Sequence, residues 1–212
     1  MKLTKEHIKY VDEYLKNQGV IYWDVRLEMV DHLVSDIENY SGSADFKAVF
    51  NRSLQKANWD KNLKDINTQS WKSTNKIYRK LHSKEMISLL KQPKSLIGFI
   101  LFYVLLNRIA VLFPENLKIA AFIVLGVPLL ILIYELIKSW RRRLGKSVNM
   151  QYGIFYFSFG IIMTNPLLQL IPKPYMNTWL PLVLTLYLVM MTAGYRVYKC
   201  AFKKALKLKG ID

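Results

Sequence analysis

The sequence predicts an all-α membrane protein, in which an N-terminal cytoplasmic helical domain precedes a four-helix transmembrane bundle and both termini are cytoplasmic. The chain of 212 residues is 52% hydrophobic and yet has a net charge of +16. Soluble globular proteins seldom combine these properties, whereas membrane proteins with basic cytoplasmic edges often do. From residue 95 onward the chain contains four long apolar runs, and each of its three strongly basic segments adjoins one of them.

The first 57 residues predict a head of three short amphipathic helices. Thr4 is the expected N-cap of the first helix and Gly19 its stop, and Ser43 is the expected N-cap of the third. The second helix is expected at about 22–39. Apolar side chains recur at helical spacing in all three helices. These stripes comprise Ile8, Val11, Tyr14 and Leu15, then Trp23, Leu27, Val30, Val34 and Ile37, and finally Phe46, Val49, Phe50 and Leu54.

Residues 58–94 connect this head to the membrane part. The stretch 58–69 is polar and reads as a linker, and a basic helix is expected at about 70–92. Pro93 then separates this juxtamembrane helix from the first apolar run, because the residue before a proline disfavours the helical conformation.

The transmembrane region is expected at 95–199. Its four runs, at about 96–113, 117–137, 150–171 and 179–198, each approach the ~20 residues that a helix needs to cross a bilayer. The hydrocarbon offers no water to backbone groups, so segments of this length should be helical. Residues 200–212 form a basic tail.

The basic segments predict the direction of the spans. They precede the first run, join the second to the third, and follow the fourth, and Lys and Arg concentrate in short cytoplasmic loops. Anionic headgroups attract such residues by roughly 1 kcal/mol each near the surface. Glu135 follows the same logic: near the inner end of the second run, beside Lys138, it can reach the headgroups. The headgroup candidates are Lys72, Lys76, Arg79, Lys80, Lys84, Arg141, Arg142, Arg143, Lys203 and Lys204.

The second helix concentrates charge on its polar face. A metal site would need three or four converging ligands, and one helix fans its side chains apart. We therefore expect no metal, no cofactor and no catalytic residue here; the open alternatives are a solvated face and a surface that recognises a protein partner. The candidate partner-binding residues are Arg26, Glu28, Asp31, His32, Asp36 and Glu38.

The pattern "YWDVRLEMVDHLVSDIE…SADFKAVFNRSL" resembles the small helical HAAS-type signalling domain, over residues 1–57 only. In that family a cytoplasmic three-helix module precedes several membrane spans in bacterial proteins associated with PadR-type regulators. The resemblance implies signalling and a bacterial cytoplasmic membrane location. The positions that it carries over are Glu28, Asp31, His32, Glu38 and Phe46.

Four polar residues fall at a similar outer depth of the first and third runs. They are expected either to hold these spans together or to form part of a small ligand site, and the first use is the more common one. These residues are Asn107, Arg108, Asn165 and Gln169.

The sequence thus favours a non-catalytic multi-pass membrane protein whose head binds protein partners, as a signalling or accessory subunit. A small oligomeric transporter or channel is the alternative, and a membrane enzyme with a metal site on the second helix is a third. Expected partners are anionic lipids and a protein or membrane complex, with a homo-oligomer left open. No nucleic-acid motif or aromatic-interleaved basic surface appears, so direct nucleic-acid binding is not expected.

Overall fold

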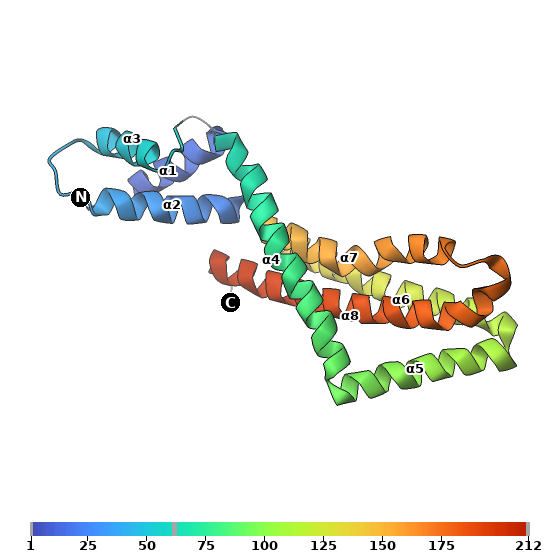
Figure 1. The fold of residues 1–212 in the computed structure, drawn as a ribbon. Coiled ribbons are helices and arrows are strands. Elements are labelled where there is room, and N and C mark those ends of the chain that lie inside the picture. Colours follow the sequence, from blue (N-terminus) through green and yellow to red (C-terminus); the bar gives the residue numbers. More distant parts are fainter. Residues whose placement is uncertain (1, 61–62, 211–212) are drawn as a thin grey trace. The chain divides into compact units, whose positions relative to one another are not determined.

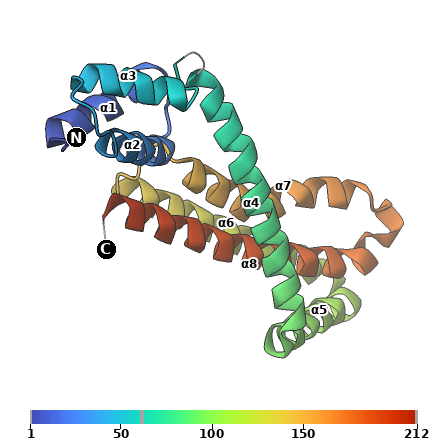
Figure 2. The same ribbon diagram turned by 60° about the vertical axis from the view of Figure 1, so that its left-hand side comes forward.

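The computed structural model describes residues 2–60 and 63–210, and every regular element in them is a helix (Figures 1 and 2). The expected all-α class is therefore confirmed. Contacts divide the chain into two compact units. The head unit comprises the chain up to Asn75 with the short segment Gly145–Asn149, and the second unit comprises Lys76–Leu144 with the chain from Met150 onward. The elements are α1 (Lys5–Asn17), α2 (Trp23–Glu38), α3 (Phe46–Lys56), α4 (Leu63–Lys91), α5 (Pro93–Leu112), α6 (Pro114–Arg141), α7 (Val148–Gln169), the 3-10 helix η1 (Lys173–Tyr175) and α8 (Met176–Lys209).

The first helix begins where the sequence predicts. The Thr4 side chain accepts a hydrogen bond from the backbone N–H of His7 at 3.3 Å, and the Thr4 backbone N–H donates to His7 Nδ1 at 3.4 Å. This reciprocal pair satisfies two backbone donors that the first turn otherwise leaves without partners. The helix ends before Gly19, which adopts a positive φ of 96° that glycine accommodates without strain.

The core of the head unit forms where the three helices meet, and the inward face of α2 agrees with the expected stripe only in part. Leu27 is 40% exposed and Val34 is half-buried, whereas Met29 and Leu33 are buried with Val30 and Ile37. The buried residues of α2 are spaced three or four apart, as in Met29, Leu33 and Ile37, so they lie on one side of the helix. The other core residues are Val11, Leu15, Val20, Val49, Phe50, Leu54 and Leu63.

The third and fourth helices also start at other residues than expected. Asp45, not Ser43, is the N-cap of α3, and the ring of Phe46 in its first turn stacks on His7 at 4.1 Å between centroids. Helix α4 begins at Leu63, inside the stretch read as a linker; residues 61 and 62 of that stretch lie outside the described residues. Leu63 and Ile66 contact the head core, and this apolar pair explains why the helix starts early.

Among the residues that the structure describes, three helical segments of the second unit are long and apolar enough to cross a membrane: α5, α6, and η1 with α8. Helix α7, which covers most of the third apolar run, is not among them. Its 22 residues include Asn149, Gln151, Asn165 and Gln169, and these polar side chains interrupt its apolar character. The expected membrane class thus rests on three segments.

Within the second unit, α6, α7 and α8 lie side by side, and the last part of α4 crosses α7 and α8 (Figures 1 and 2). The crossing of α7 and α8 is very close. A Cβ atom added at Gly194 of α8 would lie 2.3 Å from the carbonyl oxygen of Tyr156 in α7. Contacts with α4 come from aromatic residues: Tyr78 stacks on Tyr152, and His82 lies 5.3 Å from Tyr156 between ring centroids.

Candidate functional site

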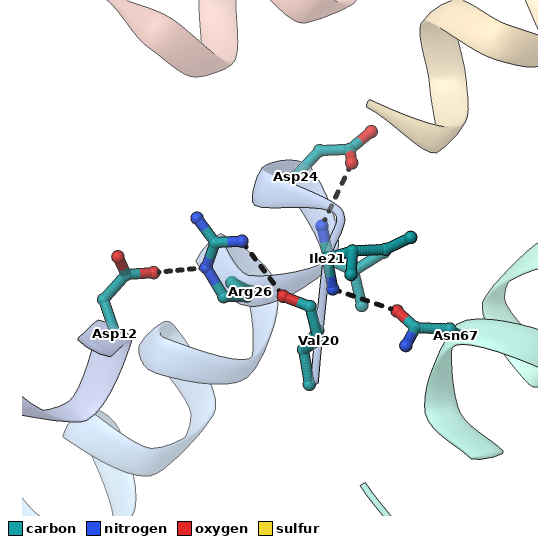
Figure 3. Close-up of polar contacts among 7 residues, drawn as sticks. Asp12, Val20, Ile21, Asp24, Arg26 and Asn67 are labelled. Carbon is teal, nitrogen blue, oxygen red and sulfur yellow. Dashed lines mark hydrogen bonds and ion pairs between the residues drawn. The ribbon is translucent and has the colours of Figure 1, made fainter. Parts of the chain in front are cut away.

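Hydrogen bonds fix the turn between α1 and α2, from which the charged helix α2 emerges (Figure 3). The Arg26 guanidinium donates to Asp12 Oδ1 at 2.9 Å and to the carbonyl of Val20 at 3.0 Å. Asn67 of α4 donates to the carbonyl of Gly19 and accepts from the backbone N–H of Ile21. Arg26 was expected on the partner-binding surface, but its side chain is only 12% exposed, so it serves the fold of the head.

Asp24, in the first turn of α2, is the most deeply buried carboxylate of the head unit at 1% exposure. It accepts hydrogen bonds from the Ser147 hydroxyl at 2.7 Å, from the backbone N–H groups of Val148 and Asn149 at 3.1 Å each, and from the Asn149 side-chain amide at 2.7 Å. The backbone N–H of Trp23 also donates to the carbonyl of Lys146 at 3.1 Å. The head therefore binds the segment between α6 and α7 tightly.

Asp24 thereby caps the N-terminus of α7, although it lies in α2, far from α7 in the sequence. The first N–H groups of a helix have no partner within it and carry partial positive charge, so a carboxylate is well suited to that position. Sequence reasoning missed Asp24 because its partners follow it by more than 120 residues. No local pattern marks such a pair, and the acidic residue alone reads as an ordinary first-turn residue of α2.

The exposed face of α2 carries the remaining candidate residues. Glu28, Asp31, His32 and Glu38 are all exposed to solvent. Within the described part of the chain, neither Glu28 nor Asp31 forms an ion pair. Since Arg26 is turned into the head, the face that remains is acidic.

Asp36 differs from the other acidic residues of α2. It accepts a hydrogen bond from the Ser53 hydroxyl at 2.7 Å and forms an ion pair with Lys56, both on α3. The hydrogen bonds from Lys56 and Ser53 lower the pKa of the Asp36 carboxyl below its ordinary value. Asp36 therefore joins α2 to α3, and its charge is largely compensated within the head. The acidic face, as used below, comprises Glu28, Asp31 and Glu38, with His32 among them.

The geometry gives the metal alternative no support. Across residues 2–60 and 63–210, no group of three or more His, Cys, Asp and Glu side chains is placed to hold a metal ion. The metal alternative draws on Glu28, His32 and Asp36 of α2. Asp36 instead accepts a hydrogen bond from Ser53 and pairs with Lys56.

The polar residues expected at the outer depth of the spans form contacts within their own helices. Asn107 donates to the Tyr103 hydroxyl in α5 at 3.5 Å, and Gln169 donates to Asn165 in α7 at 3.3 Å. Arg108 is exposed. Among the described contacts no hydrogen bond links the α5 residues to the α7 residues, so a ligand site built from all four remains a prediction.

The residues expected at the lipid headgroups are all exposed: Lys72, Lys76, Arg79, Lys80, Lys84, Arg141, Arg142, Arg143, Lys203 and Lys204. Glu135, in contrast, does not reach outward as expected. It is 2% exposed, and its carboxylate lies 3.1 Å from Lys199 of α8 and 3.4 Å from the Tyr195 hydroxyl. Its other oxygen, Oε2, is buried and has no hydrogen-bond partner among the described residues.

Comparisons with protein-family models, with curated proteins and with solved structures found no match to this chain. The resemblance of residues 1–57 to the HAAS-type domain therefore stays a prediction.

Proposed function

We propose that this protein is a multi-pass membrane protein that acts by binding rather than by catalysis, and that the acidic face of its head recognises a protein partner. The protein then serves as a signalling or accessory subunit of a membrane complex. The observation that carries the proposal is the contrast on α2: Asp24, Arg26 and Asp36 are used within the head, whereas Glu28 and Asp31 are exposed and form no ion pair with any residue that the structure describes.

The chemistry of the acidic face indicates the kind of partner. Three exposed carboxylates on one helix favour a basic or mixed surface, and such charge complementarity acts mainly on the association rate and its dependence on salt. The adjacent Leu27, which is exposed, adds apolar area that a partner can cover. The HAAS-type resemblance, which implies association with regulators, agrees with this use.

The proposed topology places the head in the cytoplasm. Helices α5, α6 and α8 cross the membrane, α7 completes a fourth crossing beside α8, and the basic segments lie on the cytoplasmic side, as the positive-inside rule requires. Because α7 has polar positions, it crosses where neighbouring helices cover it: Gly153 and Gly160 bring it close to α8. The membrane is the bacterial cytoplasmic membrane, as the resemblance implies.

The proposal is tested by reversing charge on the acidic face. The double variant Glu28→Lys/Asp31→Lys changes exposed positions outside the core, and such changes usually alter stability by no more than about 0.5 kcal/mol. We expect it to insert and fold as the wild type does but to lose a stoichiometric partner that co-purifies in mild detergent.

The matched control is Glu13→Lys/Asp60→Lys, which changes net charge equally at exposed head positions outside α2. It should keep the partner. Equal loss of the partner from both variants would show a response to net charge rather than recognition by α2, and full retention by the α2 variant would show that this face is only solvated.

A further inference from the structure

The inner end of α6 lies at the depth where headgroups are expected. Helix α5 has 20 residues and is therefore about 30 Å long, close to the thickness of the hydrocarbon. It contacts α6, and Phe113 joins the two. An equal length of α6 ends at Ile133, so Tyr134–Arg141 continues beyond the hydrocarbon on the side of the α5 N-terminus. This argument rests on the membrane topology proposed above.

Four side chains of α6 and its C-cap residue Arg142 form a stripe at this end of the helix. Tyr134, Ile137, Lys138, Arg141 and Arg142 include neighbours three and four residues apart, such as Tyr134 and Lys138 or Lys138 and Arg142, which lie next to one another on a helix surface. Together they line a shallow hollow of about 440 Å³. Tyr134 is 62% exposed and Ile137 is also exposed, so the end of the stripe nearer the hydrocarbon is apolar and the other end carries three cations.

No carboxylate lines this hollow among the residues that the structure describes. Glu135, the neighbour of Tyr134, lies on the inner side of α6 and pairs with Lys199, so it does not compensate the three cations. The C-terminal end of a helix favours positive side chains through its dipole, which helps to hold three like charges on adjacent turns. The hollow thus combines three cations that no lining carboxylate neutralises with an apolar edge on the side nearer the hydrocarbon.

We propose that this hollow binds one anionic phospholipid of the inner leaflet. Lys138, Arg141 and Arg142 hold its phosphate and negatively charged headgroup, since guanidinium and ammonium groups donate strong charge-assisted hydrogen bonds to phosphate oxygens. The glycerol region and the first carbons of an acyl chain lie against Ile137 and the ring of Tyr134, at the depth where amphipathic rings prefer the interface. The site is a specific lipid site, distinct from the general attraction between basic segments and an anionic surface.

The test counts lipids bound to the purified full-length chain by native mass spectrometry, during titration with phosphatidylglycerol or phosphatidylcholine of identical acyl chains. The wild type should retain one phosphatidylglycerol more tightly than any phosphatidylcholine. Arg141→Gln/Arg142→Gln should weaken that single binding event roughly thirtyfold. Each basic residue near the surface contributes about 1 kcal/mol to the binding of an anionic lipid, and the loss of two corresponds to this factor. Arg141→Lys/Arg142→Lys, which keeps both charges, should weaken it less than about threefold.

The matched control, Lys203→Gln/Lys204→Gln, removes the same charge from exposed positions of α8 and should leave the binding unchanged within about threefold. An equal loss in this control would show diffuse attraction and overturn the proposal, as would equal retention of the two lipids. Displacement of the lipid by millimolar inorganic phosphate would show a simple anion site instead. None of these variants touches the head, so failure here is distinguishable from failure of the partner-binding proposal.

Discussion

Asp24 holds the segment Gly145–Asn149 within the head unit. Its carboxylate is buried and accepts hydrogen bonds from Ser147, Val148 and Asn149 at 2.7 to 3.1 Å. We expect Asp24→Asn to cost about 2 kcal/mol locally, since hydrogen bonds to charged groups contribute about 1.5–3 kcal/mol and the amide brings donors against donors. Hydrogen exchange of the Val148 and Asn149 amides should become about thirtyfold faster.

The control for this prediction is Asp31→Asn, which removes the same charge from an exposed position of α2. Exchange at Val148 and Asn149 should then stay at the wild-type rate. If Asp24→Asn also leaves these amides protected, the cap contributes little and the segment is held by other contacts.

We expect His82 to make stability depend on pH. This residue of α4 is buried against α7 and α8, and one ring nitrogen lies 3.4 Å from the carbonyl of Met190. Burial lowers the pKa of the folded-state imidazole below its ordinary value of 6.5. The unfolded chain then binds a proton that the folded chain does not, so the stability from neutral His82 is complete above pH 6.5 and is lost as the pH falls toward the folded-state pKa.

Accordingly, the thermal midpoint of the wild type in detergent should be lower at pH 5.5 than at pH 7.5. The thermal midpoint of His82→Phe should fall by less over the same pH range. Phenylalanine fits beside Tyr156 and Phe159, which surround the imidazole. His32→Gln, at an exposed position, should keep the wild-type slope. An unchanged slope in His82→Phe would show that other groups produce the pH dependence.

The sequence predicted the role of a single residue well only where its contact partners are close to it in the sequence. Thr4 was recognised as an N-cap because its partner His7 is three residues away. Asp24 and Glu135 were misread or missed, because their partners are more than sixty residues distant in sequence and only the fold brings them together. The candidates Arg26 and Asp36 fit the acidic helix in sequence, yet the fold uses both internally.

Among the helices, the crossing of α7 and α8 is the contact most sensitive to size. A Cβ at Gly194 would lie 2.3 Å from the Tyr156 carbonyl oxygen and 2.8 Å from the Phe157 Cα, both backbone atoms. The helices must therefore separate to accommodate Gly194→Ala. Since overpacking typically costs about 1–3 kcal/mol, the thermal midpoint in detergent should decrease.

Gly98→Ala in α5 is the matched control, since a Cβ there would meet no described atom within 4 Å apart from its chain neighbours and the nearby backbone of its own helix. Alanine is favoured over glycine in a helix interior by up to about 1 kcal/mol, so this variant should be as stable as the wild type or more stable. Equal midpoints for the two variants would contradict the close crossing.

The spacing of apolar residues predicted that each helix exists better than it predicted which face of the helix points inward or where the helix begins. All the predicted helices are present, and Pro93 separates α4 from α5 as expected, although α5 begins at Pro93 itself. The inward face of α2 was wrong at Leu27, because apolar side chains at neighbouring positions allow two stripes and only the contacts with α1 and α3 select one. The early start of α4 was missed because Leu63 and Ile66 are isolated apolar residues in a polar stretch.

For the whole molecule, the topology is the prediction to be tested first. Reporter fusions at Asn116 and Tyr175 should report the outside, and fusions at Gly145 and at the C-terminus should report the cytoplasm, because each basic segment would otherwise lie on the wrong side. A cytoplasmic report from Tyr175 together with an external report from Asn116 would contradict the four-span topology. It would mean that α7 does not cross the membrane, as its polar positions allow, and that the chain crosses three times.

The measurement that tests the central claim most directly is photo-crosslinking in intact cells from a benzoylphenylalanine placed at Asp31. If the acidic face of α2 contacts a partner, a single discrete crosslinked species should form, and Glu28→Lys in the same chain should abolish it. The same probe at Glu13, also exposed in the head, should form no such species. Crosslinks from Glu13 equal to those from Asp31, or none from Asp31 in cells that express the protein at its natural level, would contradict the account.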